Sequence, residues 1–267
     1  MNHDPRLTLI WAEEFDSPLG TPIDESVWNF DLGDGTAAGI PGWGNQEREY
    51  YLKSQAFYDG RSNLVIEATR LPDDNDLHCY YGTPAEWASA KLTTYKKLAF
   101  QYGRLEVRLK SPRGIGTWPA FWMLGEKIVE ETWPKCGEID IFEGKGVEPR
   151  MIFGTLHGPG YSGEKPHGKV IHSDEDLCDD FNVFAIEWLE NEIAWFINDR
   201  EYFRAKSADV SPNEWVYNQP FYLITNLAMG GNFTGAIDPN LNSARLEIDW
   251  IRYYSVNGQG QLTKYNH

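Results

Sequence analysis

Apolar and polar residues alternate with a period of two along several segments of this chain, and that pattern most constrains its fold. In YGRLEVRLK, residues 102–110, the apolar Leu105, Val107 and Leu109 are separated by charged residues. Successive side chains of a β-strand point to opposite faces, so the segment is expected to be a strand with one buried face.

Further segments fit the same interpretation. EIAWFI and REYFRA, within residues 192–205, flank Asn198 and Asp199, which predicts a hairpin with its turn at these two residues. FYLITNL is expected to be another strand, and so is ARLEIDWIRYY. The alternation in the latter places the following residues on one face: Leu246, Ile248 and Trp250.

The chain contains no long stretch with helical periodicity and no internal repeat. We therefore expect an all-β fold in which two antiparallel sheets stack on each other. A chain of 267 residues is compatible with one such domain, so residues 1–267 are predicted to form one domain with its core at about 7–256. The last residues, NGQGQLTKYNH, are expected to be a tail.

The formal net charge of −16, with no run of Lys or Arg, argues against two classes of partner. Nucleic acids and anionic membranes both attract basic surfaces, so neither is expected to bind. No apolar run approaches the roughly 20 residues of a membrane span. The first residues lack the pattern of a signal peptide. The protein is therefore expected to be cytoplasmic, or secreted if a leader was removed.

The three cysteines, Cys79, Cys136 and Cys178, lack the C-x-x-C spacing that is typical of zinc sites. One disulfide with a free thiol and three buried thiols both remain open.

Three acids are crowded into the apolar segment GEIDIFEGKG, residues 137–146. Regular alternation puts Glu138 and Asp140 on one face but turns Glu143 into the core, where a charge is costly. One extra residue, a β-bulge at Ile141 or Phe142, would return Glu143 to the face of the other two. The spacing E-x-D-x-x-E therefore predicts an irregular strand.

Two glutamates on one strand face can bring their carboxyl groups to the separation of about 5–5.5 Å that retaining glycosidases use. Asp140 between them would hydrogen-bond Glu138, and mutual repulsion would raise the pKa of at least one acid. Two alternatives remain open, calcium binding by the acids and a charged strand face in solvent.

Aromatic residues surround this segment. Trp118 and Trp122 are four residues apart, hence on one face of a strand, and Trp133 lies five residues before Glu138. Flat apolar rings beside polar groups suit a sugar, although each tryptophan could instead pack in the core. His157 could hydrogen-bond a catalytic carboxylate or a sugar hydroxyl, or simply end a strand. The turn-rich segments 31–46 and 157–169 are expected to border the site.

These motifs carry a family resemblance. GEIDIFE after GTWPAFWMLG resembles glycoside hydrolase family 16, the laminarinase-like β-glucanases. Other segments resemble the family in the same order: WAEEFD, GWGNQEREYY, YGRLEVRLKSPRG, GTLHGPGYSG, FNVFAIEW, YLITNLAMGGNFTG and LEIDWIRYY. The resemblance implies a β-jelly-roll with a substrate cleft on its concave sheet, retaining double displacement and no catalytic cofactor.

By this resemblance Glu138 is the nucleophile, Glu143 the acid/base and Asp140 the residue that assists the nucleophile. It also implies a set of substrate-binding residues: Asn45, Glu47, Lys91, Trp118, Trp122, Trp133 and His157. Lys91 stands where many members have Arg, and lysine keeps the charge but not the planar fork. The resemblance further implies a structural Ca²⁺ held by the following groups: Glu14, the Gly60 carbonyl and Asp249.

We therefore expect a monomeric endo-acting β-1,3-glucanase whose partner is a β-glucan polysaccharide or oligosaccharide. A non-catalytic β-glucan-binding protein is the alternative from another class, although such relatives have usually lost one of the acids. A transglycosylase, or a hydrolase of mixed-linkage glucan or of a galactan, also remains open.

Overall fold

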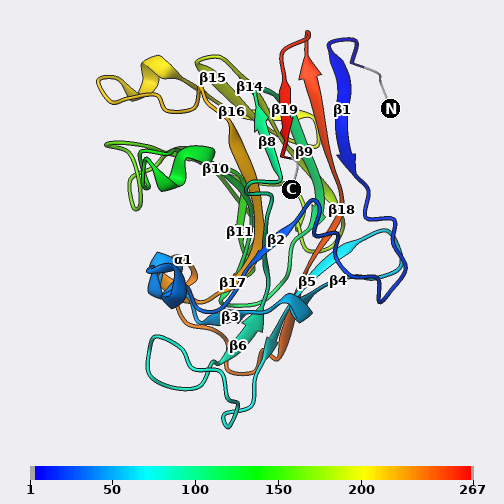
Figure 1. The fold of residues 1–267 in the computed structure, drawn as a ribbon, viewed down its shortest axis with the longest axis vertical. Coiled ribbons are helices and arrows are strands. Elements are labelled where there is room, and N and C mark those ends of the chain that lie inside the picture. Colours follow the sequence, from blue (N-terminus) through cyan, green and yellow to red (C-terminus); the bar gives the residue numbers. More distant parts are fainter. Residues whose placement is uncertain (1–3, 266–267) are drawn as a thin grey trace.

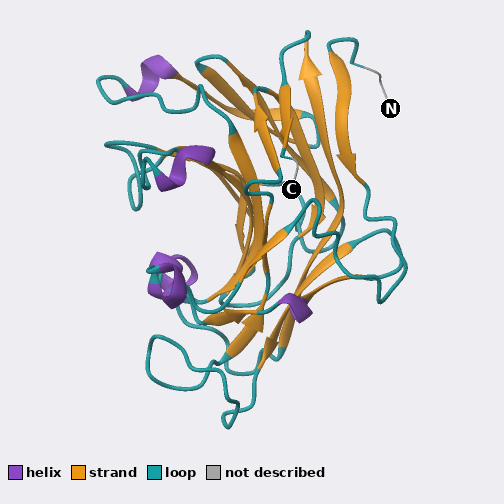
Figure 2. Cartoon of the chain, in the orientation of Figure 1, coloured by secondary structure: helices purple, strands orange, loops and turns teal. Residues whose placement is uncertain are grey.

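The computed structural model describes residues 4–265, which form two β-sheets packed face to face (Figure 1, Figure 2). We call the nine-stranded sheet the concave sheet, because it curves around an open side flanked by loops and short helices (Figure 2). The ten-stranded sheet behind it is the outer sheet. The predicted all-β sandwich of mainly antiparallel sheets is confirmed.

The concave sheet has the spatial order β13 (His167–His172), β12 (Glu148–His157), β11 (Glu138–Lys145), β10 (Thr117–Gly125), β17 (Phe221–Met229), β7 (Lys91–Thr93) and β2 (Asn29–Asp31). Two more strands join it beside β17: β8 (Leu98–Gln101) and β19 (Gln261–Lys264).

The outer sheet has the order β16 (Arg200–Lys206), β15 (Glu192–Ile197), β14 (Asn182–Leu189), β9 (Gly103–Lys110), β18 (Ser243–Val256), β5 (Leu64–Arg70), β6 (Trp87–Ser89) and β3 (Glu49–Tyr51). Two strands join it at the side: β1 (Leu7–Glu13) on β18 and β4 (Ala56–Tyr58) on β5.

Helices are short, as the sequence pattern predicts. The described residues contain these: α1 (Gly231–Thr234), and the 3₁₀ turns η1 (Thr36–Ala38), η2 (Pro41–Gly44), η3 (Lys53–Gln55), η4 (Glu126–Val129) and η5 (Ser207–Val210). Over residues 4–265, none has the length or apolar character that crossing a membrane requires.

The core lies between the sheets and follows the period of two. Leu105, Val107 and Leu109 of β9 are buried, as predicted. From the other sheet, Phe142 of β11 packs on Phe184 of β14 with ring centroids 4.3 Å apart. The acid-bearing strand is thereby anchored from behind, through its apolar face.

The hairpin prediction is confirmed, since β15 and β16 are joined by Asn198 and Asp199, both with positive φ. The three cysteines are free thiols, which leaves no disulfide among the described residues.

Two sequence predictions are wrong. Trp250 does not share the buried face of Leu246 and Ile248, because a bulge at Asp249 shifts the register of β18 and gives the next buried position to Ile251. The C-terminal residues are not a tail throughout: after a turn, β19 pairs with β8, and Leu262 packs on the core. The concave sheet therefore extends beyond the predicted core boundary at residue 256.

Candidate active site

The predicted β-bulge lies on β11. Phe142 pairs with Phe121 of β10 and Asp140 pairs with Trp122, so Ile141 between them is the extra residue. Ile141 and Phe142 are both buried in the sandwich, at 1% and 0% exposure. The bulge keeps two consecutive apolar side chains in the core and leaves Glu143 on the face of the other two acids.

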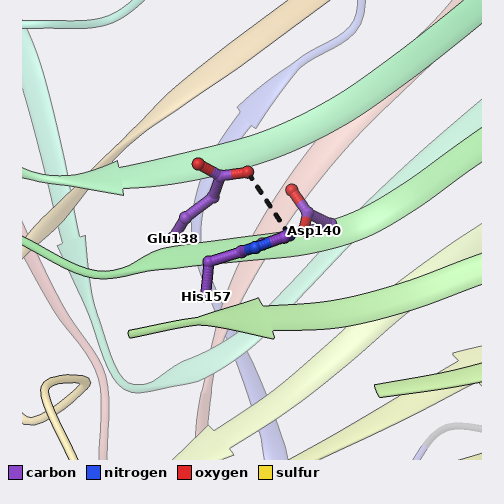
Figure 3. Close-up of side chains that lie close together, drawn as sticks. All are labelled: Glu138, Asp140 and His157. Atoms are coloured by element: carbon purple, nitrogen blue, oxygen red, sulfur yellow. Dashed lines mark ion pairs between the residues drawn. The ribbon is translucent and has the colours of Figure 1, made fainter. Parts of the chain in front are cut away.

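Glu138 lies at the start of β11, between an aromatic donor and a histidine. The indole Nε1 of Trp133 donates to Oε2 of Glu138 at 2.7 Å, and His157 Nε2 is 3.8 Å from Oε1 (Figure 3). Burial and then the charge of Asp140 raise the pKa of Glu138 to about 8, against the opposing effects of His157 and Trp133. A hydrogen bond between Asp140 and Glu138 contributes to the same rise.

Glu143 has less stabilisation for its charged form. Nε1 of Trp118 donates to its Oε1 at 3.0 Å. Burial, followed by the charge of Asp140, raises the pKa of Glu143 well above its ordinary value, and the charge of Glu138 adds to this. Glu143 is therefore the better candidate to hold a proton near neutral pH.

Asp140 is 2% exposed and is held from two sides. It accepts hydrogen bonds from the Thr155 hydroxyl and, at 3.2 Å, from His157 Nε2 (Figure 3). Its backbone carbonyl accepts from the indole of Trp195 at 2.8 Å, which ties the strand to the outer sheet. The side chain is thus fixed between the two glutamates.

His157 is subject to two opposing influences. Burial lowers its pKa, but the hydrogen bond and charge of Asp140 outweigh this and raise the pKa to about 9. The N–H of Gly163 donates to Nδ1 at 3.1 Å, which requires a lone pair there and favours the neutral ring with its hydrogen at Nε2. Full protonation of His157 therefore requires this loop contact to be given up.

The three tryptophans are not core residues. Trp118 and Trp122 are partly exposed, Trp133 is 44% exposed, and the indole N–H groups of Trp118 and Trp133 both bond to a glutamate. Trp122 donates to Oδ1 of Asn226 on β17 at 2.8 Å. This arrangement fits sugar platforms beside polar groups.

The other residues predicted to bind substrate connect to Trp122. Lys91 Nζ lies 5.3 Å from the Trp122 ring centroid, 4.2 Å from that of Trp43, and 3.4 Å from Oδ2 of Asp31. Asn45 donates to Oε1 of Glu47 at 3.0 Å. Both turn-rich segments predicted to border the site thus contribute to it, the first through Trp43 and Asn45 and the second through Gly163.

Three residues at the site were not predicted from the sequence: Asn226, Phe153 and Phe233. The Phe233 ring on α1 lies 4.6 Å from that of Trp118 and 4.9 Å from that of Phe153, and Lys145 Nζ lies 4.2 Å from its centroid. Phe153 is opposite Glu143 across β11 and β12, so alternation back from His157 could have identified it. Phe233 lies on the short α1, whose sequence carries no such signal.

A cavity of about 420 Å³ opens on the same sheet, next to the Lys91–Asp31 pair. Its position follows from the strand register, in which Thr93 of β7 lies opposite Asn29 of β2. The lining residues are Asn29, Asp31, Thr93, Tyr95, Lys96, Lys97 and Tyr222.

The sequence left two metal sites to examine, calcium at the acids of β11 and a structural Ca²⁺ away from them. Ligand atoms of Glu138, Asp140 and His157 lie within 4.8 Å of one another, but one imidazole and two carboxylates are not the all-oxygen shell that calcium prefers. Of the residues predicted to hold a structural Ca²⁺, Glu14 bonds to Arg252 and Asp249 to Arg108. Calcium at these groups and the Gly60 carbonyl would compete with the two arginines, and that site stays a prediction.

Two partly buried glutamates on one face of a concave β-sheet, with an aspartate between them, form the acid arrangement of a retaining glycoside hydrolase. The chain belongs to glycosyl hydrolases family 16, whose family model matches residues 45–252. A β-glucanase of Rhodothermus marinus is 37% identical over 264 residues, covering 94% of this chain and 86% of the relative.

Solved structures agree with this assignment. The laminarinase catalytic domain from Thermotoga maritima MSB8 superposes with a TM-score of 0.87 at 43% identity, covering 93% of this chain and 98% of that chain. The endo-β-1,3-glucanase from Pyrococcus furiosus gives 0.86 at 41% identity, over 93% and 94%. The predicted family and jelly-roll fold are confirmed.

Proposed function

We propose that this protein is an endo-acting β-1,3-glucanase that cleaves laminarin-type glucan with retention of anomeric configuration. The observation that supports this most is the bulge at Ile141, which places Glu138 and Glu143 on one sheet face, each held by a tryptophan N–H. Relatives that match over nearly the whole chain are named laminarinase and endo-β-1,3-glucanase.

In the first step, Glu143 gives its proton to the glycosidic oxygen while a carboxylate oxygen of Glu138 attacks the anomeric carbon. The C–O bond to the leaving chain breaks and a glycosyl ester forms on Glu138. In the second step, Glu143 removes a proton from water, whose oxygen attacks the same carbon and releases Glu138. The proton that Glu143 gives to the leaving chain is thus replaced by one from water, and both glutamates return to their starting states.

Asp140 and His157 prepare Glu138 for this reaction. His157 Nε2 lies 3.2 Å from Oδ2 of Asp140 and 3.8 Å from Oε1 of Glu138, and these contacts hold both carboxylates in place. When Glu138 becomes esterified its negative charge disappears, which relieves repulsion with Asp140. Crowding of the acids therefore favours the covalent intermediate.

The glycone side is expected to run across β10, β17, β7 and β2, over Trp122 and Lys91 toward the cavity at Tyr95. Flat rings with few charges suit a neutral glucan. One solved relative, 29% identical, is named a non-specific endo-β-1,3(4)-glucanase, so the range of linkages has to be measured.

The first experiment is product analysis on laminarin, lichenan, agarose and carrageenan. Rapid release of mixed oligosaccharides from laminarin is the expected result, and release of products from the galactans alone would contradict the proposal. A relative from Penaeus monodon is named a β-1,3-glucan-binding protein, and a reducing-end assay on laminarin separates that activity from hydrolysis.

The roles of the two glutamates can be tested with azide and an aryl β-glucoside that has a good leaving group. Glu138→Ala is expected to form the α-glycosyl azide, because azide then attacks from the face of the missing nucleophile. Glu143→Ala is expected to form the β-glycosyl azide through the glycosyl-enzyme. The opposite assignment of products would reverse the two roles.

A further inference from the structure

A second pair of buried acids lies beside the site, outside the catalytic strand. Glu47 and Glu49 alternate with Arg48 at the start of β3 and are 6% and 1% exposed. No arginine or lysine lies within ion-pair distance of either carboxylate among residues 4–265. Two buried carboxylates cannot both remain ionised at close range without a strong penalty, so one of them must hold a proton.

The hydrogen-bond donors around the two carboxyl groups differ. Glu47 accepts from Asn45 Nδ2 on Oε1 at 3.0 Å and from the Tyr51 hydroxyl on Oε2 at 3.2 Å. The charge of Lys91 also favours its ionised form. These contacts all stabilise a negative charge on Glu47.

The surroundings of Glu49 are different. Its Oε2 accepts the backbone N–H of Met229 at 2.7 Å. Its Oε1 is buried and meets no N–H or O–H donor in the described chain. An oxygen in this position is satisfied when it carries the proton itself and donates it.

We propose that Glu49 is a positioning residue that keeps its carboxyl proton on Oε1 and donates it to Glu47, fixing Glu47 as the anionic group that receives sugar hydroxyls. The inference rests on the proposed function for the role of Glu47 toward glucan. It assigns to Glu49 a role that requires a neutral acid.

The titration of the pair agrees with this geometry. Burial, then the charge of Glu47, raises the pKa of Glu49 well above its ordinary value. Burial also raises the pKa of Glu47, but the hydrogen bond from Glu49 and the charge of Lys91 oppose the rise. The other titratable groups that sense Glu49 are Tyr51, Tyr80 and Cys79.

A chain of hydrogen bonds connects the pair to the sugar platform. Trp122 Nε1 donates to Asn226, whose Nδ2 donates to the Tyr51 hydroxyl at 3.1 Å, and Tyr51 in turn donates to Glu47. All donors point toward Glu47, so an ionised Glu47 is the acceptor on which the whole chain ends. Loss of its charge would loosen Tyr51 and, through Asn226, Trp122.

The test compares amide and apolar replacements at the two positions. In Glu49→Gln the amide oxygen can accept from Met229 and the amide N–H can donate to Glu47, so KM for laminarin is expected to stay within about twofold. Glu49→Met removes the donor. KM is expected to rise about tenfold with kcat little changed, because one charge-assisted hydrogen bond to Glu47 is lost. Glu47→Gln should raise KM at least as much as Glu49→Met.

Thermal melting identifies variants that fail to fold. Equal rises of KM in Glu49→Gln and Glu47→Gln would overturn the proposal, and so would an unchanged KM in folded Glu49→Met. A readout that needs no substrate is the infrared band of protonated carboxyl groups at neutral pH. One component should vanish in Glu49→Gln and persist in Glu143→Gln.

The infrared result stands whether or not laminarin is cleaved. A protein that shows the Glu49 band but hydrolyses no β-glucan would refute the proposed function and leave the protonation of Glu49 established. A glucanase that loses no band in Glu49→Gln would refute the inference alone.

Discussion

Strands β9 and β11 both place charged side chains among apolar ones, yet the charges are paired on β9 and unpaired on β11. On β9, in the outer sheet, buried Arg104 bonds to Glu106, Glu187 and Asp199. On β11, in the concave sheet, Glu138, Asp140 and Glu143 have no arginine or lysine partner within the described chain, only indoles, a hydroxyl and His157. The paired charges on β9 join neighbouring strands of the outer sheet. The unpaired acids on β11 instead have raised pKa values, which suit acid–base catalysis.

The difference shows that a buried acid on a strand does not by itself indicate a site. Glu106 is nearly as buried as Asp140, yet it lies on a regularly alternating strand that carries no site. On β11, burial and then the charge of Asp140 raise the pKa of Glu138 and Glu143, and no arginine or lysine of residues 4–265 pairs with these acids to oppose the rise. The predictions below test this contrast in order of expected effect.

The largest effect is expected on turnover. Glu138→Ala and Glu143→Ala should each lower kcat on laminarin by about 10³-fold or more, because each removes a group that makes or breaks a bond. Glu106→Ala on β9 should leave kcat of the folded protein unaltered. A rate assay with protein concentration corrected for the folded fraction measures both, and a comparable loss in Glu106→Ala would end the contrast between the two strands.

The second effect concerns stability of the outer sheet. Arg104→Met leaves Glu106 and Glu187 with fewer cations in a buried position, and is expected to destabilise the protein by about 3 kcal/mol. The loss should grow as pH rises above the ordinary carboxylate pKa of about 4, because the unpaired acids ionise more readily in the unfolded chain. Denaturant unfolding at several pH values measures it. Equal loss at all pH values would mean that lost packing is the cause.

The third effect is a gain of stability, in contrast to the loss expected for Arg104→Met. The pKa of Glu138 is raised to about 8 in the folded protein, so its ionisation opposes folding. That contribution to stability is complete below the unfolded pKa of about 4.3 and is lost as pH rises toward 8. Glu138→Gln should therefore raise the melting temperature at pH 7 by about 3 °C or more, for a gain of 1 kcal/mol or more, and change it little at pH 4.

A melting temperature of Glu138→Gln that is lower than that of the wild type at pH 7 would show that Glu138 is stabilised in its ionised form. The β9 counterpart, Glu106→Gln, provides the matched control. It replaces a paired acid with the same amide and is expected to lower stability at pH 7.

The sequence predicted the bulge on β11 because misplacing Glu143 would bury a charge. The bulge at Asp249 had no such signal, since Trp250 is acceptable on either face, and its register was therefore missed. Residues that join the site from distant segments, such as Asn226 and Phe233, depend on how the strands pair. The Glu47–Glu49 pair could not be identified either, because its significance lies in the donors that surround each oxygen.

The smallest effect is expected at Lys91, a buried lysine of the concave sheet whose charge favours the ionised form of Glu47. Lys91 is 8% exposed and contacts Asp31 and the rings of Trp43 and Trp122. Lys91→Arg keeps the charge and adds a planar fork that can bond Asp31 with two N–H groups and stack on Trp43. We expect KM for laminarin to fall by about twofold, with kcat unchanged, because the ring and the anion that hold the sugar become better fixed.

Lys91→Met is the matched control for that change. It keeps the stem but removes the charge, so the pKa of Glu47 should rise and KM should increase by about fivefold, most strongly at low pH where Glu47 then gains a proton. Initial rates over a range of laminarin concentrations at two pH values measure both variants. If Lys91→Met raised KM equally at both pH values, Lys91 would act by direct contact with sugar. The charge of Lys91 would then have no influence on KM through the ionisation of Glu47.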